Sequence, residues 1–288
     1  MRSWLVTIAI ALKVGDGVVL GADSASTLAA GSQVLNVYFN AEKVFNLCKG
    51  LPIGAVTYGL GSLQNRSIAL LSKDLRERLS ASGKWELKRN QFHVKDVVER
   101  MREFFYEERY KKEWPRQLTD PATGLERDVY AARGFMVAGY SAGQREAEVW
   151  TFEIDPSGTA AITELFPVGH TGIEAKGQPE ALLRLMNGWS PRILEGLVAS
   201  GIPLQDALTF LRSQAMEPLV QSGMPIQDAI DLVRYLIEVT AGFVRFIPGE
   251  LSVHEPIDIA AVTYHEAFRW VRRKHYFSPE LNPPSPGV

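Results

Sequence analysis

Apolar residues dominate two short runs near the N-terminus, at 5–12 and 17–22. The segment 15–17, Gly-Asp-Gly, stands between them and is typical of a tight hairpin turn. Both runs are apolar at odd and even positions alike, as strands covered on both faces are. Two more strands are predicted at 43–47 and 53–58. The N-terminal quarter of the chain is therefore expected to be mostly β structure.

A helical period replaces this pattern further along the chain. Apolar positions recur every three or four residues over 62–80 and again over 93–112. The second of these stretches has a face of Lys, Glu and Arg, which indicates a solvated surface rather than a binding patch. The helical pattern returns from 178 to about 243. Three helical regions are predicted.

Strands are also predicted at 134–139, 148–154 and 257–262, whereas 114–128 contains two prolines and a glycine and is expected to be a loop. The tail 278–288 is rich in proline and is expected to be flexible. Strands and helices thus come in separate blocks rather than in alternating βαβ units. This order predicts an α+β sandwich.

An internal repeat lies in the helical region: the segment 197–207 recurs, with substitutions, as 219–229. Each copy contains Ser-Gly followed by a proline, which is typical of one helix ending and another beginning. Two copies are too few for a solenoid. We expect stacked helical hairpins that cover a sheet.

Composition narrows the class of protein. The chain has 288 residues, of which 46% are hydrophobic, and its 31 basic and 33 acidic residues give a net charge of -2. These values exclude a disordered chain and give no electrostatic reason to expect nucleic acid or a membrane as a partner. Cys48 is the only cysteine, so no intramolecular disulfide can form, which favours a cytoplasmic location. The alternative is export, because 4–12 resembles a short signal peptide, but Lys13 ends that run.

Several motifs suggest a catalytic or binding function, but the residues around each motif do not fit that function. Ser141 lies in Gly-Tyr-Ser-Ala-Gly, the pattern of a hydrolase nucleophile elbow, but a strand follows where the elbow needs a helix. A hairpin turn is the better interpretation. The pattern Gly59-Leu60-Gly61 has Gln64 where a dinucleotide-binding loop needs glycine. Five scattered histidines and one cysteine form no metal-binding spacing. Neither a cofactor nor a metal is expected.

Three polar residues remain at the ends of neighbouring predicted strands: Thr7, Asp23 and Lys43. Lys43 is expected to share an apolar face with Phe45 and Leu47, and a buried lysine needs an anionic partner, for which Asp23 is the obvious candidate. On residue chemistry alone, this set is either a structural ion pair or an activated hydroxyl.

The segments that contain these residues resemble a proteasome-type subunit, a family of N-terminal nucleophile hydrolases. The resemblance runs through 7–23, which includes Thr7 and Asp23, through Glu42-Lys43-Val44-Phe45, through 54–61 and through 256–263. It is closest to bacterial homologues that assemble without separate α and β chains.

The resemblance implies a four-layer αββα sandwich over 7–277, with helical insertions at about 81–133 and 190–222. It also implies that 1–6 is a propeptide whose removal exposes Thr7. The position before the cleavage point is Val6, where the family usually has glycine.

The resemblance further assigns roles in peptide hydrolysis. Thr7 is then the nucleophile, Asp23 the orienting acid and Lys43 the electrostatic activator, while a backbone N–H at Lys176 or Gly177, in an expected turn, forms the oxyanion hole. The implied assembly is a ring-like or stacked homo-oligomer that degrades peptides or unfolded proteins, with an unfoldase partner left unidentified. The alternative is a catalytically inactive scaffold subunit that keeps residues 1–6.

Overall fold

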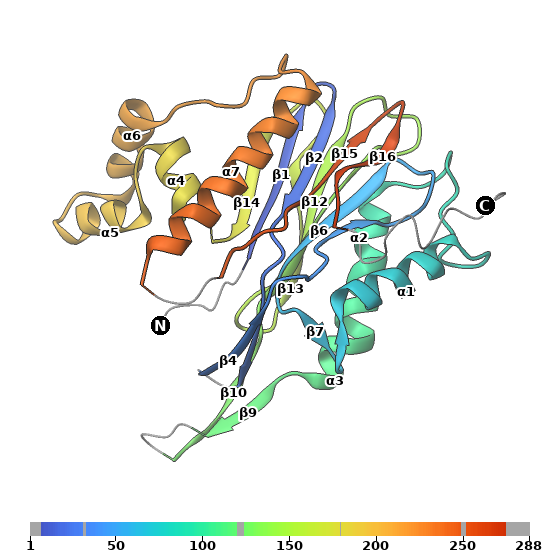
Figure 1. Cartoon of the computed structure of the whole chain (residues 1–288), viewed down its shortest axis with the longest axis horizontal. Helices are drawn as coiled ribbons and strands as arrows, with labels where there is room; N and C mark the ends of the chain where they lie inside the picture. The colour runs from blue at the N-terminus through green and yellow to red at the C-terminus, as the bar shows by residue number, and fades with distance from the viewer. Residues whose placement is uncertain (1–6, 31–32, 120–123, 179, 249–251, 275–288) are drawn as a thin grey trace.

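A computed structural model describes residues 7–30, 33–119, 124–178, 180–248 and 252–274. The expected propeptide, 1–6, and the expected tail, 278–288, lie outside these residues. The described chain is a mixed α+β structure in which two five-stranded sheets lie between groups of helices (Figure 1).

The first sheet brings together strands from near both ends of the described chain. Its strands, in spatial order, are β14 (Gly172–Gly177), β1 (Ile8–Val14), β2 (Gly17–Ala22), β15 (Asp258–Thr263) and β16 (Ala267–Arg272). Each pair of neighbours is antiparallel. The hairpin predicted within 5–22 is confirmed over its described residues, 7–22, because β1 and β2 pair from Ala9↔Ala22 to Val14↔Gly17.

The second sheet is also antiparallel throughout. In spatial order it contains β13 (Ala160–Phe166), β12 (Glu148–Ile154), β11 (Arg133–Gly139), β6 (Ile53–Gly59) and β5 (Val44–Asn46). The strands predicted at 43–47, 53–58, 134–139 and 148–154 are confirmed. The sequence pattern did not predict β13, β14 or β16.

An apolar cluster joins the facing sides of the two sheets. Alternation along β1 turns Ala9 and Ala11 toward the second sheet, while Ile8 and Ile10 face the opposite side. Small side chains allow close approach: a Cβ added at Gly54 in β6 would lie 2.6 Å from Cδ2 of Phe268 in β16. Small residues of both sheets, Ala9 and Ala11 in the first and Gly54 in the second, therefore allow the two sheets to approach closely.

Helix α7 (Ile226–Phe246) covers the outer face of the first sheet (Figure 1). Val233, Leu236 and Ile237 are fully buried against β1 and β2. A Cβ added at Gly21 would lie 2.4 Å from Cγ1 of Val233, so the glycine lets the helix lie directly on the strand.

The outer face of the second sheet is covered by α1 (Ile68–Ser80), α2 (Val94–Arg102) and the π-helical segment η1 (Glu103–Tyr110), with a short α3 (Lys111–Glu113) after it. The helix predicted at 93–112 is confirmed. The helix predicted at 62–80 begins later than expected, because Gln64 and Asn65 adopt positive φ in a tight hairpin of β7 (Ser62–Leu63) and β8 (Arg66–Ser67). The Ser67 hydroxyl then accepts a hydrogen bond from the N–H of Leu70 and caps α1.

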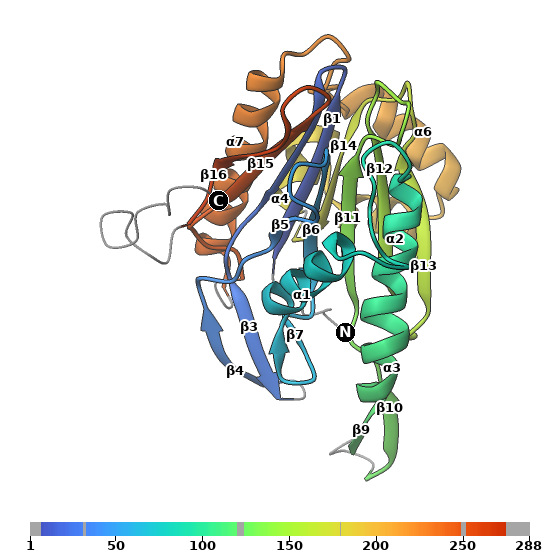
Figure 2. The ribbon, with the colours of Figure 1, turned by 90° about the vertical axis from the view of Figure 1, so that its right-hand side faces the viewer.

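Two other hairpins extend toward the same end of the molecule (Figures 1 and 2). One pairs β3 (Ser26–Ala30) with β4 (Gln33–Tyr38), and the other pairs β9 (Arg116–Thr119) with β10 (Glu126–Val129). The loop predicted at 114–128 is therefore wrong. Within the described residues, Pro115 directly precedes this two-stranded arm and Gly124 lies between its strands.

The repeat also differs from its prediction. In the first copy α5 (Pro191–Ala199) ends near Ser-Gly and α6 (Leu204–Ala215) begins after a proline; in the second copy only the start of α7 is helical. Of these helices α7 packs on the sheet, whereas α5 has no buried residue and extends, with α6, away from both sheets (Figure 1). Helix α4 (Glu180–Asn187) lies between them and α7. The repeated segments share their helix-start signals but not their packing.

One charged residue of the core has no polar partner among the residues that the structure describes. Arg133, at the start of β11, is 1% exposed, and none of its three guanidinium nitrogens is hydrogen-bonded there. The guanidinium lies 4.8 Å from the ring centre of Phe135 and 5.1 Å from that of Phe105. Burial lowers the pKa of Arg133 to about 9. The two rings compensate only part of the lost hydration.

We therefore expect Arg133→Met to raise the free energy of unfolding by about 1–4 kcal/mol, because an apolar chain of similar length removes the unpaired buried charge. Arg109 provides the matched control. It lies 3.5 Å from the centre of the Phe104 ring but also donates hydrogen bonds to Glu108 and to the carbonyl of Phe104. Arg109→Met should lower stability by about 1–3 kcal/mol. Urea denaturation measures both, and a loss of stability in both variants would show that the buried charge of Arg133 is no net cost to the fold.

Candidate active site

Thr7 and Asp23 meet at one end of the first sheet. Thr7 directly precedes β1 and Asp23 directly follows β2, and the N–H of Asp23 donates a 3.3 Å hydrogen bond to the carbonyl of Ile8. Both residues are almost completely buried, at 1% and 0% exposed. The antiparallel register of the hairpin therefore places the hydroxyl and the carboxylate side by side.

Lys43 comes from the second sheet and connects the two. Its Nζ lies 2.7 Å from Oδ1 of Asp23 and also donates a hydrogen bond to Oγ1 of Thr7. The predicted partnership of Lys43 with Asp23 is confirmed. The predicted face is wrong, because β5 begins only at Val44. Phe45 and Leu47 pack under the helices, while Lys43 reaches toward the first sheet.

Backbone groups hold the Asp23 carboxylate from several directions. Oδ1 accepts a hydrogen bond from the N–H of Ile8 at 3.0 Å, and Oδ2 accepts from Ala25 at 2.8 Å and His254 at 3.3 Å. With Lys43, the carboxylate has four donors. Such a carboxylate has little freedom to move, so it fixes the position of the lysine ammonium.

The surroundings of Lys43 lower the pKa of its ammonium group. Burial lowers the pKa of Lys43, and the negative charge of Asp23 opposes this effect without cancelling it. Lys274, a second cation in the surroundings, lowers the pKa further. Lys43 is thus held in apolar surroundings by its contact with one carboxylate.

The second cation belongs to a polar pair that the sequence pattern did not predict. The Nζ of Lys274 pairs with Asp258 at the start of β15 and donates a hydrogen bond to Oγ of Ser24 at 2.5 Å. Both members of the pair are buried, with side chains 6% and 1% exposed. An aspartate in the apolar strand pattern at 257–262 is the signal that could have indicated a buried partner.

The two residues expected at the oxyanion hole, Lys176 and Gly177, are the last two residues of β14 rather than part of a turn. The N–H of Gln178 donates to the carbonyl of Thr7 at 2.7 Å. Alternation in an antiparallel ladder then turns the N–H of Gly177 away from β1 and that of Lys176 toward Ala9. Of the two, Gly177 has the amide on the open side of the strand.

Gly177 is also required by the backbone beside Thr7. Its φ is +99°, and a Cβ there would lie 2.0 Å from the carbonyl oxygen of Thr7. The side chain of Lys176 lies near Glu174 at 3.3 Å and Glu153 at 3.5 Å. Burial disfavours the charged form of the Lys176 side chain, but the two carboxylates outweigh this effect and raise the pKa of Lys176. Lys176 is thus held by carboxylates near the contact between the sheets.

Ser141 has a structural role that explains its position. Its hydroxyl accepts a hydrogen bond from the N–H of Val94 at 2.9 Å, at the start of α2, and donates one to Glu148. The segment around it connects β11 to β12 as a hairpin, as predicted. Since no helix follows the serine, the nucleophile-elbow alternative fails on geometry.

Two further features of the described residues bear on other functions. No group of three or more His, Cys, Asp or Glu side chains within them is arranged to hold a metal ion. Among the helices in this part of the chain, none is long and apolar enough to cross a membrane.

The comparisons with known proteins leave the site to be interpreted from its own geometry. The chain matches no protein-family model and no curated protein.

Proposed function

We propose that the chain is a threonine-type peptidase with an N-terminal nucleophile at Thr7, on a four-layer αββα sandwich of the proteasome type. The observation that carries the proposal is the buried contact of the Thr7 hydroxyl with Lys43, which Asp23 holds in place. Two sheets packed face to face, with helices outside each, are consistent with that architecture.

Each residue of the site has a chemical task in this proposal. Once the peptide bond between Val6 and Thr7 is broken, Thr7 has a free α-amine, whose ordinary pKa of about 8 suits a base at neutral pH. The amine takes the hydroxyl proton as Oγ1 attacks a peptide carbonyl, and the protonated amine then gives the proton to the leaving amine. An ester to Thr7 results, and water hydrolyses it.

Lys43 supports both groups electrostatically. A cation beside the hydroxyl and the amine lowers the pKa of each, which favours the alkoxide in the transition state and the neutral base in the free enzyme. Asp23 is a positioning residue, because it acts through the lysine. The outward-facing N–H of Gly177 remains our candidate for the oxyanion hole.

The backbone contacts around Thr7 are compatible with a cleavage step before it. Its carbonyl is held by Gln178, and the next amide, that of Ile8, is held by Asp23. The contacts that position Thr7 therefore come from its C-terminal side and from its side chain. Loss of residues 1–6 would leave these contacts in place.

A self-assembled compartment is the second part of the proposal. Helices α5 and α6 expose several large apolar side chains, among them Ile193, Leu204 and Phe210, at 49%, 54% and 62%. Surfaces of this kind suit contacts between copies of the chain. In this scheme peptides or unfolded proteins reach Thr7 inside a homo-oligomer.

The alternative is an inactive scaffold subunit that keeps residues 1–6. The observation that favours it is the depth of the site: Thr7 is 1% exposed, and a buried Lys43–Asp23 pair can join two sheets without any reaction. The two functions differ in whether the Thr7 hydroxyl is needed for activity or only for packing.

Substitution of the nucleophile separates them. We expect Thr7→Ala to abolish cleavage of fluorogenic peptides and of an unfolded protein, and Thr7→Ser to retain part of the rate because it keeps the hydroxyl. Thr209→Ala, on an exposed face of α6, is the control and should keep the full rate. Size-exclusion chromatography should show the same assembly for all variants. Equal cleavage by the parent protein and Thr7→Ala would contradict the proposal.

A pH profile tests the role of Lys43. We expect kcat/KM to fall in acid as the Thr7 amine gains a proton, and to fall again in alkali as Lys43 loses one. Because the pKa of Lys43 is lowered, the alkaline fall should come below its ordinary value of 10.5. Lys43→Arg, which keeps its charge to higher pH, should reduce the rate but move the alkaline fall upward. An unshifted fall in Lys43→Arg would assign it to another group.

A further inference from the structure

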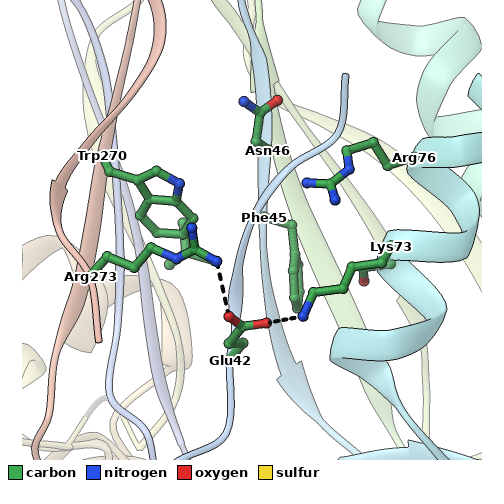
Figure 3. A pocket seen from close by; sticks show the side chains of 9 residues that line it. Glu42, Phe45, Asn46, Lys73, Arg76, Trp270 and Arg273 are labelled. Carbon is green, nitrogen blue, oxygen red and sulfur yellow. Dashed lines mark hydrogen bonds and ion pairs between the residues drawn. The ribbon is translucent and has the colours of Figure 1, made fainter. Parts of the chain in front are cut away.

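A second polar site lies outside the Thr7 region, in a pocket between β5, α1 and β16 (Figure 3). The pocket is small, with a cavity volume of about 40 Å³. Its walls are apolar at Val44, Phe45 and Trp270 and polar elsewhere. None of its lining residues contacts the Thr7 hydroxyl, so the peptidase mechanism does not use it.

One acidic residue of the pocket already has its partners. Glu42, whose side chain is 7% exposed, lies 3.1 Å from Lys73 and 3.2 Å from Arg273, one on each side (Figure 3). Burial disfavours its charge, but the two cations outweigh burial and hold the pKa of Glu42 below its ordinary value. With Arg76 the lining contains three cations and one anion, so the pocket keeps a net positive charge.

Three polar groups of the lining have no hydrogen-bond or ion-pair partner among the described residues. Oγ of Ser72 and Oδ1 of Asn46 are buried without a hydrogen bond, and the Ser72 residue is only 3% exposed. The third is the guanidinium of Arg76, which extends from α1 toward the strand that contains Asn46 (Figure 3). A buried polar atom without a partner costs about 1–3 kcal/mol, so the Ser72 and Asn46 oxygens, beside the half-buried guanidinium of Arg76, indicate a ligand.

The unpaired groups define the chemistry of that ligand. Arg76 needs an acceptor, which is best an oxyanion, because a guanidinium binds two oxygens at once. The amide oxygen of Asn46 needs a donor, and the hydroxyl of Ser72 can serve either group. An ionised carboxylate or a sulfate offers acceptors only, whereas hydrogenphosphate offers acceptors and one P–OH donor.

We propose that this pocket binds a phosphate group that keeps one P–OH, as hydrogenphosphate or as a singly ionised monoester, through Arg76, Ser72 and Asn46. Lys73 and Arg273 add positive charge at the rim while they hold Glu42. This site is independent of the peptidase proposal, because it needs neither cleavage before Thr7 nor the Thr7 hydroxyl.

Isothermal titration of the full chain with sodium phosphate, and separately with sodium sulfate at equal ionic strength, tests the proposal. We expect saturable binding of one phosphate per chain and at least tenfold weaker binding of sulfate. Arg76→Gln should weaken phosphate binding at least tenfold. The control Arg192→Gln removes the same charge from the exposed surface of α5 and should leave binding unchanged.

Asn46→Ala tests the donor requirement: it should bring the affinity for phosphate close to that for sulfate. Ser72→Ala is a smaller change in the same pocket and should also weaken the binding of phosphate. This second variant keeps the test decisive if another variant fails to fold. Titration with glycerol 3-phosphate separates the two sources, since tighter binding than free phosphate assigns the site to a monoester and weaker binding assigns it to the free ion. Absence of saturable phosphate binding, or equal binding of phosphate and sulfate by the parent protein, would overturn the proposal.

Discussion

The buried ion pair between Lys43 and Asp23 is the interaction on which the candidate site depends. It joins a residue just before β5 of the second sheet to a residue just after β2 of the first. Removing two charges from water costs several kcal/mol for each ion, and here the cost is offset by a 2.7 Å contact and by three backbone N–H groups on the carboxylate. A lysine without this carboxylate would be a buried charge without a counter-ion, and the hydroxyl of Thr7 would lose its donor.

The same pair shows how much of the site the sequence could predict. Thr7 and Asp23 stand at the ends of a hairpin that alternation and turn signals locate, so their meeting could be expected from local patterns. Lys43 precedes a strand of the other sheet, and its pairing with Asp23 could be expected only because a buried lysine needs an anion. The pair of Lys274 and Asp258 could not be predicted, because neither β16 nor its pairing with β15 was evident from the sequence pattern. The expected turn at Lys176 and Gly177 proved to be a strand, since β14 pairs with β1.

The fold shows the same division between local and long-range information. Strands with apolar residues on both faces and helices with one apolar stripe were predicted well, because burial imposes these periods locally. The helix at 62–80 was predicted too early, because Gln64 and Asn65 take left-handed conformations that the pattern does not indicate. The arm formed by β9 and β10 contains largely exposed residues, so it has no apolar pattern from which to predict it. The burial of Arg133 was not predicted either, because nothing in the sequence pattern indicates that a basic residue at a strand end is buried.

Two adjacent residues, Glu42 and Lys43, connect the two sites of this protein. Lys43 turns to Thr7 and Asp23, whereas Glu42 turns to Lys73 and Arg273 at the phosphate pocket. Ion pairs on both residues hold the short segment before β5 between the first sheet and α1. The candidate chemistry of Thr7 thus rests on a backbone segment that is fixed on both sides by charge.

The central claim is that Thr7 becomes the N-terminal residue, and the mass of the purified full-length protein tests it most directly. Intact-mass measurement together with N-terminal sequencing should give a chain that begins at Thr7. The same measurement on Thr7→Ala should give a chain that keeps residues 1–6 if the hydroxyl performs the cleavage. A parent protein that still contains Val6 before Thr7 would have no α-amine at the site, and it would contradict the peptidase in favour of the scaffold.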